Sequence, residues 1–197
     1  MEVRKQFGRP SGAVGALVGH LMAVKNRQRS LFVLSLLDVG PEDRVLEIGF
    51  GPGVDVARVA ERASRGFVAG IDHSEVMVRQ AVRRNAEAIG AGRVELRLGN
   101  ASRLPHPDGC FDKAFAINVA QFWSRAAETL AEVRRVLRPG GLAAIAVQPR
   151  SKGASEETAR QTGEALARAL KAAGFKTVRL ESRPLRPVSV VVALANA

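Results

Sequence analysis

A glycine-rich segment at the end of a short apolar run is where the chain's residue types could most clearly do chemistry. Gly49, Gly51 and Gly53 follow the carboxylate of Glu47. Glycines allow a sharp turn and a close approach of a ligand to the backbone, and the helix expected next offers unpaired N–H groups. Val54 stands where a dinucleotide fingerprint needs its third glycine, and the Gly-Lys-Ser/Thr of a phosphate loop is absent. An acid two residues before the first glycine therefore favours a ligand with a cationic end.

A second acid lies at the end of the next apolar run, 23 residues after Gly49. Asp72 follows the run that extends from Gly66 to Ile71. In doubly wound sheets a carboxylate at this place can accept hydrogen bonds from both ribose hydroxyl groups. The alternative is an Asp that only caps the following helix.

Two further segments complete a family pattern. Residues 98–112 begin with Leu-Gly-Asn-Ala-Ser and continue through a proline-bearing loop, and residues 135–141 read Arg-Val-Leu-Arg-Pro-Gly-Gly. With the Glu47 to Gly53 turn and Asp72, they resemble the class I S-adenosylmethionine-dependent methyltransferases. The resemblance covers about residues 40 to 197. It is greatest to the small-molecule group that includes quinone-biosynthesis methyltransferases, and four motifs in the family's order make it specific.

The resemblance implies an S-adenosylmethionine site of ten residues. Glu47 would meet the amino group of the cofactor, which the Asn118 backbone would also contact, and Asp72 would hold the ribose. Asn100 stands where the family usually has Asp, but its side-chain oxygen can still accept from the adenine amino group. The full set is Glu47, Gly49, Phe50, Gly51 and Gly53 along the methionine and ribose, Asp72 at the ribose, His73, Asn100 and Ala101 near the adenine, and Asn118.

The family's reaction is an in-line displacement at a sulfonium methyl group, so the enzyme mainly aligns the acceptor and excludes water. A general base is needed only if the acceptor must lose a proton. No residue is certain to be catalytic; the candidates are His20 and Gln121, and for His20 the alternative is a surface or packing role. Phe7, His20, Gln121 and Trp123 are the candidate acceptor-binding residues, with helix packing as the alternative for Trp123. No metal site is expected, because the single cysteine cannot form a multi-cysteine site.

The elements that must position these residues alternate between strand and helix from Arg44 onward, which predicts an α/β sheet with helices on both faces. Expected strands cover residues 44–49, 66–71, 94–98, 111–118, 142–147, 175–182 and 188–194, and expected helices cover 54–64, 74–89, 124–137 and 155–173. The last two strands are too close for a crossover helix, so the final strand should be antiparallel. The resemblance implies a Rossmann-like doubly wound, seven-stranded sheet of order 3-2-1-4-5-7-6, with strand 7 antiparallel.

Ligands bind beyond the carboxyl ends of the strands in such sheets, which predicts a site in the loops after Ile48, Ile71, Leu98 and Ile117. Residues 1–40 precede these motifs. Apolar positions between Val14 and Met22 recur at helical spacing, and a second helix is expected to extend to Leu37 with Leu31, Leu34 and Leu37 in phase. We interpret residues 1–40 as an N-terminal helical cap on a cofactor-binding core of residues 41–197, all in one domain. Two helices that merely pack on the sheet are the alternative.

Composition sets the remaining limits. The chain has 197 residues, of which 46% are hydrophobic, as expected for one globular domain. It lacks a long uncharged apolar run and an apolar signal core, and together with its one cysteine this favours the cytoplasm. The net charge of +11 makes an RNA methyltransferase one alternative, although scattered arginines make a nucleic-acid partner unlikely. A non-catalytic cofactor-binding regulator is the other alternative; the acceptor and the oligomeric state stay open.

Overall fold

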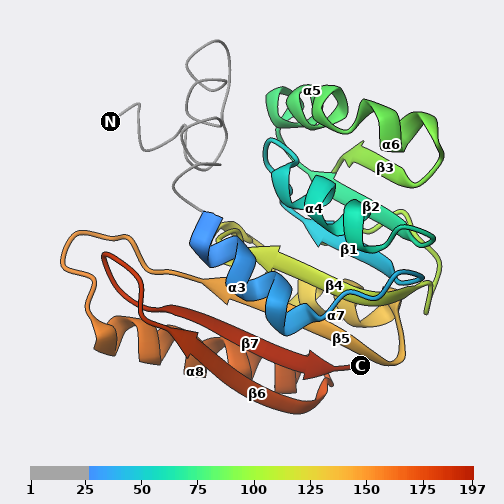
Figure 1. Cartoon of the computed structure of the whole chain (residues 1–197). Coiled ribbons are helices and arrows are strands. Elements are labelled where there is room, and N and C mark those ends of the chain that lie inside the picture. The colour runs from blue at the N-terminus through green and yellow to red at the C-terminus, as the bar shows by residue number, and fades with distance from the viewer. Residues whose placement is uncertain (1–26) are drawn as a thin grey trace.

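A mixed sheet runs through residues 27–197, which are the part of the chain that the computed structural model describes (Figure 1). Its strands are β1 (Arg44–Ile48), β2 (Phe67–Asp72), β3 (Val94–Leu98), β4 (Phe111–Ile117), β5 (Leu137–Val147), β6 (Lys176–Arg183) and β7 (Val190–Asn196). Within these residues the sheet has seven strands in the order β3-β2-β1-β4-β5-β7-β6. β7 is antiparallel to β5 and β6, and the other neighbouring strands are parallel. The predicted Rossmann-like fold is confirmed.

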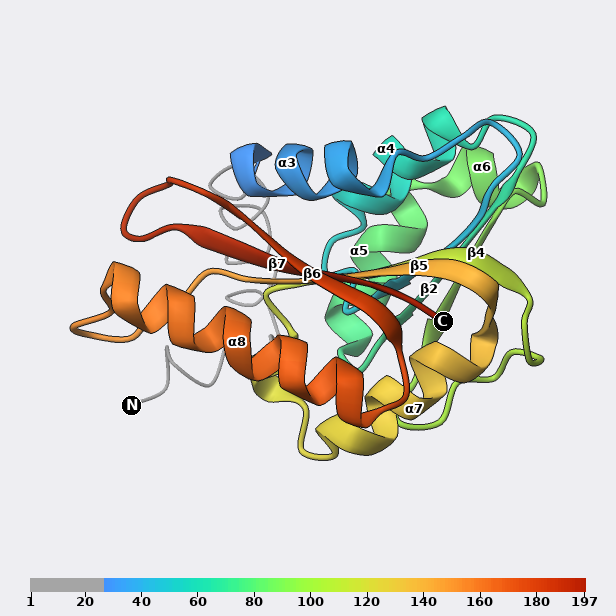
Figure 2. The ribbon, with the colours of Figure 1, turned by 90° about the horizontal axis from the view of Figure 1, so that it is seen from below.

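Helices cover both faces of the sheet (Figure 2). They are α3 (Arg27–Leu37), α4 (Val54–Arg62), α5 (Glu75–Arg84), α6 (Ala86–Gly90), α7 (Ala126–Val136) and α8 (Glu156–Ala172), with a short 3-10 turn, η1 (Ala120–Phe122). One core lies between the sheet and α3, α4 and α5, and includes Val45 and Phe115. The other lies under α7 and α8, and includes Leu46 and Ile145. β1, β2 and β7 are buried on both faces and read as continuous apolar runs, which is why their positions were predictable.

The helix α3 belongs to the first of these cores. Val33, Leu34 and Leu37 are fully buried. Leu31, expected to be in phase with them, is 38% exposed, so that expectation was wrong. Arg29 is buried instead, because a residue four positions before Val33 lies on the same side of a helix. Residues 1–26, which contain the first expected helix, lie outside the described part of the chain, and the division into cap and core at residue 40 stays a prediction.

Two expected elements differ in detail. The helix predicted over residues 74–89 is interrupted at Asn85, whose side-chain amide donates to the carbonyl oxygens of Ala81 and Gly53. The turn predicted at residues 139–141 lies within β5, which begins at Leu137, and the β4–β5 register shifts there. Both differences are local and leave the place of the element in the fold unchanged.

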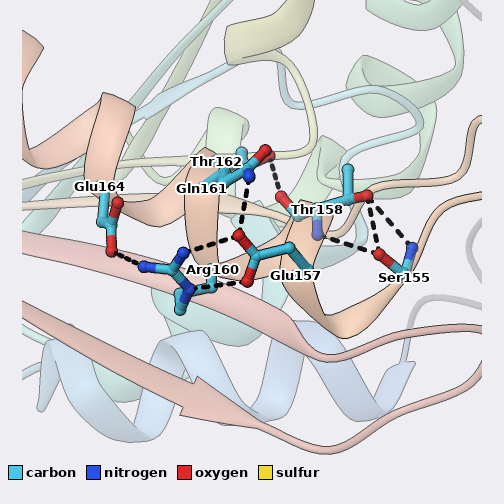
Figure 3. Close-up of polar contacts among 7 residues, drawn as sticks. All are labelled: Ser155, Glu157, Thr158, Arg160, Gln161, Thr162 and Glu164. Carbon is cyan, nitrogen blue, oxygen red and sulfur yellow. Dashed lines mark hydrogen bonds and ion pairs between the residues drawn. The ribbon is translucent and has the colours of Figure 1, made fainter.

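The start of α8 is defined by side chains close in the sequence (Figure 3). Ser155 and Thr158 exchange backbone-to-side-chain hydrogen bonds in a capping box. The guanidinium of Arg160 pairs with the carboxylates of Glu157 and Glu164 one turn away on either side. Exposed pairs of this spacing each stabilise a helix by a few tenths of a kcal/mol, so the capping box is the stronger contribution.

We predict that α3 contributes to the stability of the domain. Leu34→Ala should lower the free energy of unfolding by about 2–5 kcal/mol, because it leaves a cavity in the core. Leu31→Ala on the same helix should change it by less than about 0.5 kcal/mol. Urea denaturation measures both values. Equal losses from the two substitutions would contradict the burial pattern of α3.

Candidate functional site

The carboxylate of Asp72 joins the turn after β1 to the end of β2. One of its oxygens accepts a hydrogen bond from the backbone amide of Gly51 at 2.9 Å, and the other accepts from the amide of Ser74, also at 2.9 Å. The amide of Gly49 donates to the carbonyl oxygen of Ile71 at 2.8 Å. These loops lie where β1 separates β2 from β4 and the strand order reverses, which is the place predicted for a ligand.

Two glycines of the turn are required for different reasons. Gly51 has a φ of +53°, and no described atom lies within 4 Å of where its Cβ would be, so the backbone is open to a ligand. Gly49 has a φ of +72°, and a Cβ there would lie 2.5 Å from a methyl group of Val119, which belongs to the loop after β4. The turn therefore has an open side at Gly51 and a packed side at Gly49.

The other two predicted residues of the turn face the interior. Gly53 is buried and precedes α4 as its N-cap. The side chain of Phe50 is buried in the core, close to Gly70 of β2, so only its backbone can face a ligand.

The carboxyl group of Glu47 is buried beside this turn. The residue is 3% exposed, and its Oε2 has no hydrogen-bond partner within residues 27–197. Burial raises its pKa well above 4.5, and the neighbouring carboxylates of Asp55 and Asp72 raise it further, while Arg58 opposes them. Burying a carboxyl oxygen without a hydrogen-bond donor costs free energy, and a bound cation that donates to this oxygen would offset that cost. The residues therefore fit a ligand with an ammonium group.

The loop after β4 is connected to the end of β5 through side chains. Asn118 has a left-handed φ of 56°. Its side-chain oxygen accepts from the backbone amide of Gln148 at 2.7 Å, and its carbonyl oxygen accepts from the side chain of Gln121 at 2.9 Å. The predicted contact of the Asn118 backbone with an amino group would therefore share or replace the Gln121 hydrogen bond.

The predicted adenine-side residues lie in the loops after β2 and β3. His73 is exposed, with its Nδ1 3.8 Å from Oδ1 of Asp72. Asn100 is exposed, and its side-chain oxygen accepts from the backbone amide of Ser102 at 3.0 Å and from its hydroxyl group. Ala101 is half-buried against the core. Since Asn100 already has a local donor, an adenine amino group would have to share this oxygen.

Arg135 anchors the same loop and gives the 135–141 motif a structural role. Its guanidinium donates to the carbonyl oxygens of Leu104 and His106 at 3.0 and 2.8 Å. It also pairs with Glu132 and Asp108. The loop after β3 is thereby held against α7 close to the start of β4.

The acceptor-side candidates are only partly described. Gln121 is exposed beside Asn118, and Trp123 is half-buried and packs against the core under α7 and α8. Phe7 and His20 lie outside the described residues. The packing alternative for Trp123 thus has direct support.

Sequence reasoning missed several polar residues around the site. Asp55, in the first turn of α4, accepts from the hydroxyl group of Ser30 at 2.6 Å and pairs with Arg58. Arg29 and Gln148 are buried and hydrogen-bonded to each other at 2.8 Å. Arg29 could have been recognised from the sequence as a charged residue on the core-facing side of α3. This recognition requires knowing which face of the helix is buried.

Residues 27–197 contain no group of three or more His, Cys, Asp or Glu side chains arranged to hold a metal ion. Over the same range, no helix has both the length and the apolar character needed to cross a membrane.

Comparison with known proteins gives consistent matches. A family model described as "Methyltransferase domain" matches residues 45–141. The uncharacterized methyltransferase YdaC of Bacillus subtilis (strain 168) is 31% identical over 180 residues, which cover 91% of this chain and 97% of that protein. The demethylmenaquinone methyltransferase of Symbiobacterium thermophilum is 36% identical over 102 residues, or 51% of this chain and 41% of that protein.

A solved structure shares the fold. The crystal structure of a SAM dependent methyltransferase from Aquifex aeolicus superposes with a TM-score of 0.67 at 23% identity. The match covers 85% of this chain and 88% of the other.

We predict that the buried carboxyl of Glu47 lowers the stability of the protein at neutral pH. Its pKa is higher in the folded than in the unfolded state, so the free energy of unfolding should fall as the pH rises from about 4.5 toward the folded-state pKa. Glu47→Gln should remove this fall and stabilise the protein at pH 7 by about 0.5–2 kcal/mol. Denaturant unfolding across pH measures both effects, with Glu61→Gln, an exposed acid of α4, as the control. A Glu47→Gln protein less stable than wild type at pH 7 would contradict the assignment.

Proposed function

Because the chain belongs to the class I S-adenosylmethionine-dependent methyltransferases, we propose that it transfers the cofactor's methyl group to a small-molecule acceptor. The observation that carries the proposal is the buried, unpartnered carboxyl oxygen of Glu47 beside the open turn at Gly51. The similarity to a demethylmenaquinone methyltransferase supports a small-molecule acceptor.

The residues have distinct proposed roles. Glu47 would bind the ammonium group of the cofactor, and an N–H of that group would donate to the unpartnered Oε2. Asp72 would bind the ribose hydroxyl groups with the lone pairs left after its bonds to Gly51 and Ser74, since a carboxylate has about four acceptor positions. Bound S-adenosylmethionine supplies a methyl group already activated by the positive charge on sulfur. The chain itself then has to align the acceptor and exclude water.

The acceptor side would lie beyond β4 and β5. Gln121 would orient a polar acceptor, and residues 1–40 would act as the cap. Among residues 27–197, His106 is a poor general base, because its ring packs edge-on against Phe111 at 5.0 Å and burial lowers its pKa. The proposed reaction therefore depends on positioning rather than on proton abstraction by His106.

We predict that Asp72→Ala weakens the binding of S-adenosylmethionine by about 1.5–3 kcal/mol, or roughly 10- to 150-fold, because a charged hydrogen-bonding group is lost. It should also lower stability, since two backbone amides lose their acceptor. Binding is measured by calorimetry at a temperature where circular dichroism shows that the variant is folded. This separates the loss of affinity from the loss of stability. Glu61→Ala, at an exposed acid of α4, is the control. Binding of NAD without binding of S-adenosylmethionine would contradict the cofactor assignment.

We predict that radiolabelled methyl groups are transferred to small molecules and not to RNA. A panel of hydroxylated aromatic compounds, quinols and bulk RNA tests both acceptor classes with one enzyme preparation. RNA binding, if detected, should weaken steeply with added salt and show no sequence preference, because phosphate contacts dominate such binding. Label in a defined RNA at physiological salt would favour the RNA alternative. Tight cofactor binding without transfer to any member of a broad panel would favour the regulatory one.

A further inference from the structure

A cavity of about 560 Å³ lies beside the candidate site, between the start of α3, the segment after β5 and the β6–β7 loop. The first turn of α3 and these two connections lie at the same end of the sheet in both views (Figures 1 and 2). Arg29, Arg150 and Arg186 line the cavity together with Gln148, and the described lining residues include no carboxylate. Its volume is typical of small-molecule sites.

Arg29 is the unusual member of this cavity. It is 2% exposed, its Nη1 donates to Gln148 Oε1 at 2.8 Å, and its buried Nε has no hydrogen-bond partner among the described residues. Burial, and to a smaller extent the charge of Arg150, lower its pKa to about 10, while Asp55 opposes the shift. A buried guanidinium with an unused donor and a second cation beside it needs a negative charge that residues 27–197 do not place in the cavity.

Gln148 holds the lining in place. Its Oε1 accepts from Arg29 and, at 3.2 Å, from Arg150, while its Nε2 donates to the carbonyl oxygens of Arg186 and Val188 at 3.1 and 2.7 Å. All of its side-chain hydrogen-bonding capacity is therefore directed to the cavity wall. A preorganised wall binds a ligand without the entropic cost of ordering it.

The β6–β7 loop is fixed from a second side. The backbone amide of Ser189 donates to a carboxylate oxygen of Glu156, in the first turn of α8, at 2.9 Å. The connection that carries Arg186 is thus tied both to the end of β5 and to α8.

The same residues connect the cavity to the candidate cofactor site. The backbone amide of Gln148 binds the side chain of Asn118, and Ser30, next to Arg29, binds Asp55 after the glycine-rich turn. The cavity thus lies at the carboxyl ends of the strands, on the β5 side of the site. A molecule occupying it would extend toward the loop after β4.

We propose that this arginine-lined cavity binds an anionic group, a carboxylate or a phosphate, of the small-molecule methyl acceptor. The inference rests on the proposed function. Arg29 provides a free N–H and a buried charge, and Arg150 and Arg186 provide exposed charges at the rim. Guanidinium groups match the planar oxygen pairs of both anions.

The first experiment measures anion binding with inorganic phosphate, by calorimetry against sodium chloride at equal ionic strength. Arg150→Gln should weaken phosphate binding at least fivefold, and Arg29→Met at least tenfold. Arg27→Gln, an exposed arginine on the same helix that does not line the cavity, should change it less than twofold. Because Arg150 is exposed, Arg150→Gln should fold, and phosphate binding can be measured on this variant even if Arg29→Met does not fold. Equal affinities in wild type, Arg150→Gln and a folded Arg29→Met would overturn the proposal.

The second experiment compares matched acceptors in the methyl-transfer assay. Aromatic hydroxy acids are paired with their amides, and monophosphate esters with the parent alcohols, which separates carboxylate from phosphate. The anionic members should have at least tenfold higher kcat/KM, and Arg150→Gln should raise KM for these members only. Transfer to neutral members at equal or higher efficiency would overturn the proposal.

The two proposals fail in different ways. If the protein does not bind the cofactor, or transfers methyl groups to none of the small molecules, the proposed function is contradicted. The phosphate titration then tests independently whether the cavity binds an anion. Intact cofactor binding and transfer, without any effect of the cavity variants, counts against the anionic acceptor alone. Label in RNA, with phosphate binding lost on adding RNA, would reassign the cavity to a nucleic-acid backbone and contradict both.

Discussion

The two hydrogen bonds of the Asp72 carboxylate are the constraint on which the site depends. They connect the end of β2, the glycine-rich turn after β1 and the residue before α5. Without an acceptor for the Gly51 amide, a turn that needs a positive φ would keep the Gly49–Ile71 hydrogen bond but lose its side-chain tie to the end of β2. The same carboxylate has a structural role and a proposed ribose-binding role, because a carboxylate has acceptor positions beyond the two that these amides use.

Two buried ionisable groups near this site lower the stability of the protein. Glu47 is buried with an oxygen that lacks a donor, and Arg29 is buried with a donor that lacks an acceptor. Each is unfavourable within the described structure, and each would be compensated by a ligand group of opposite charge. Proteins commonly tolerate such costs at binding sites, where a stabilising replacement would remove function.

The opposite signs of these two groups also suggest how ligands would be oriented. A cationic group would be held near β1 and an anionic group near the end of β5, with Asn118 and Gln148 between them. Acceptor and cofactor would then bind in one relative orientation, which an in-line transfer requires. The loop after β3 is held separately, by the hydrogen bonds of Arg135.

The sequence by itself predicted most of the strands and helices and the glycine-rich turn, while the strand order came from the family resemblance. Strands buried on both faces leave continuous apolar runs, and glycines with positive φ leave a local signature, so both could be recognised without coordinates. It did not determine the phase of α3, because Leu31, Leu34 and Leu37 share a spacing but not a buried face. Only the tertiary structure brought Arg29 to Gln148 and Arg150, from segments more than a hundred residues apart. Such contacts depend on how the sheet packs against its helices, and no local pattern records them.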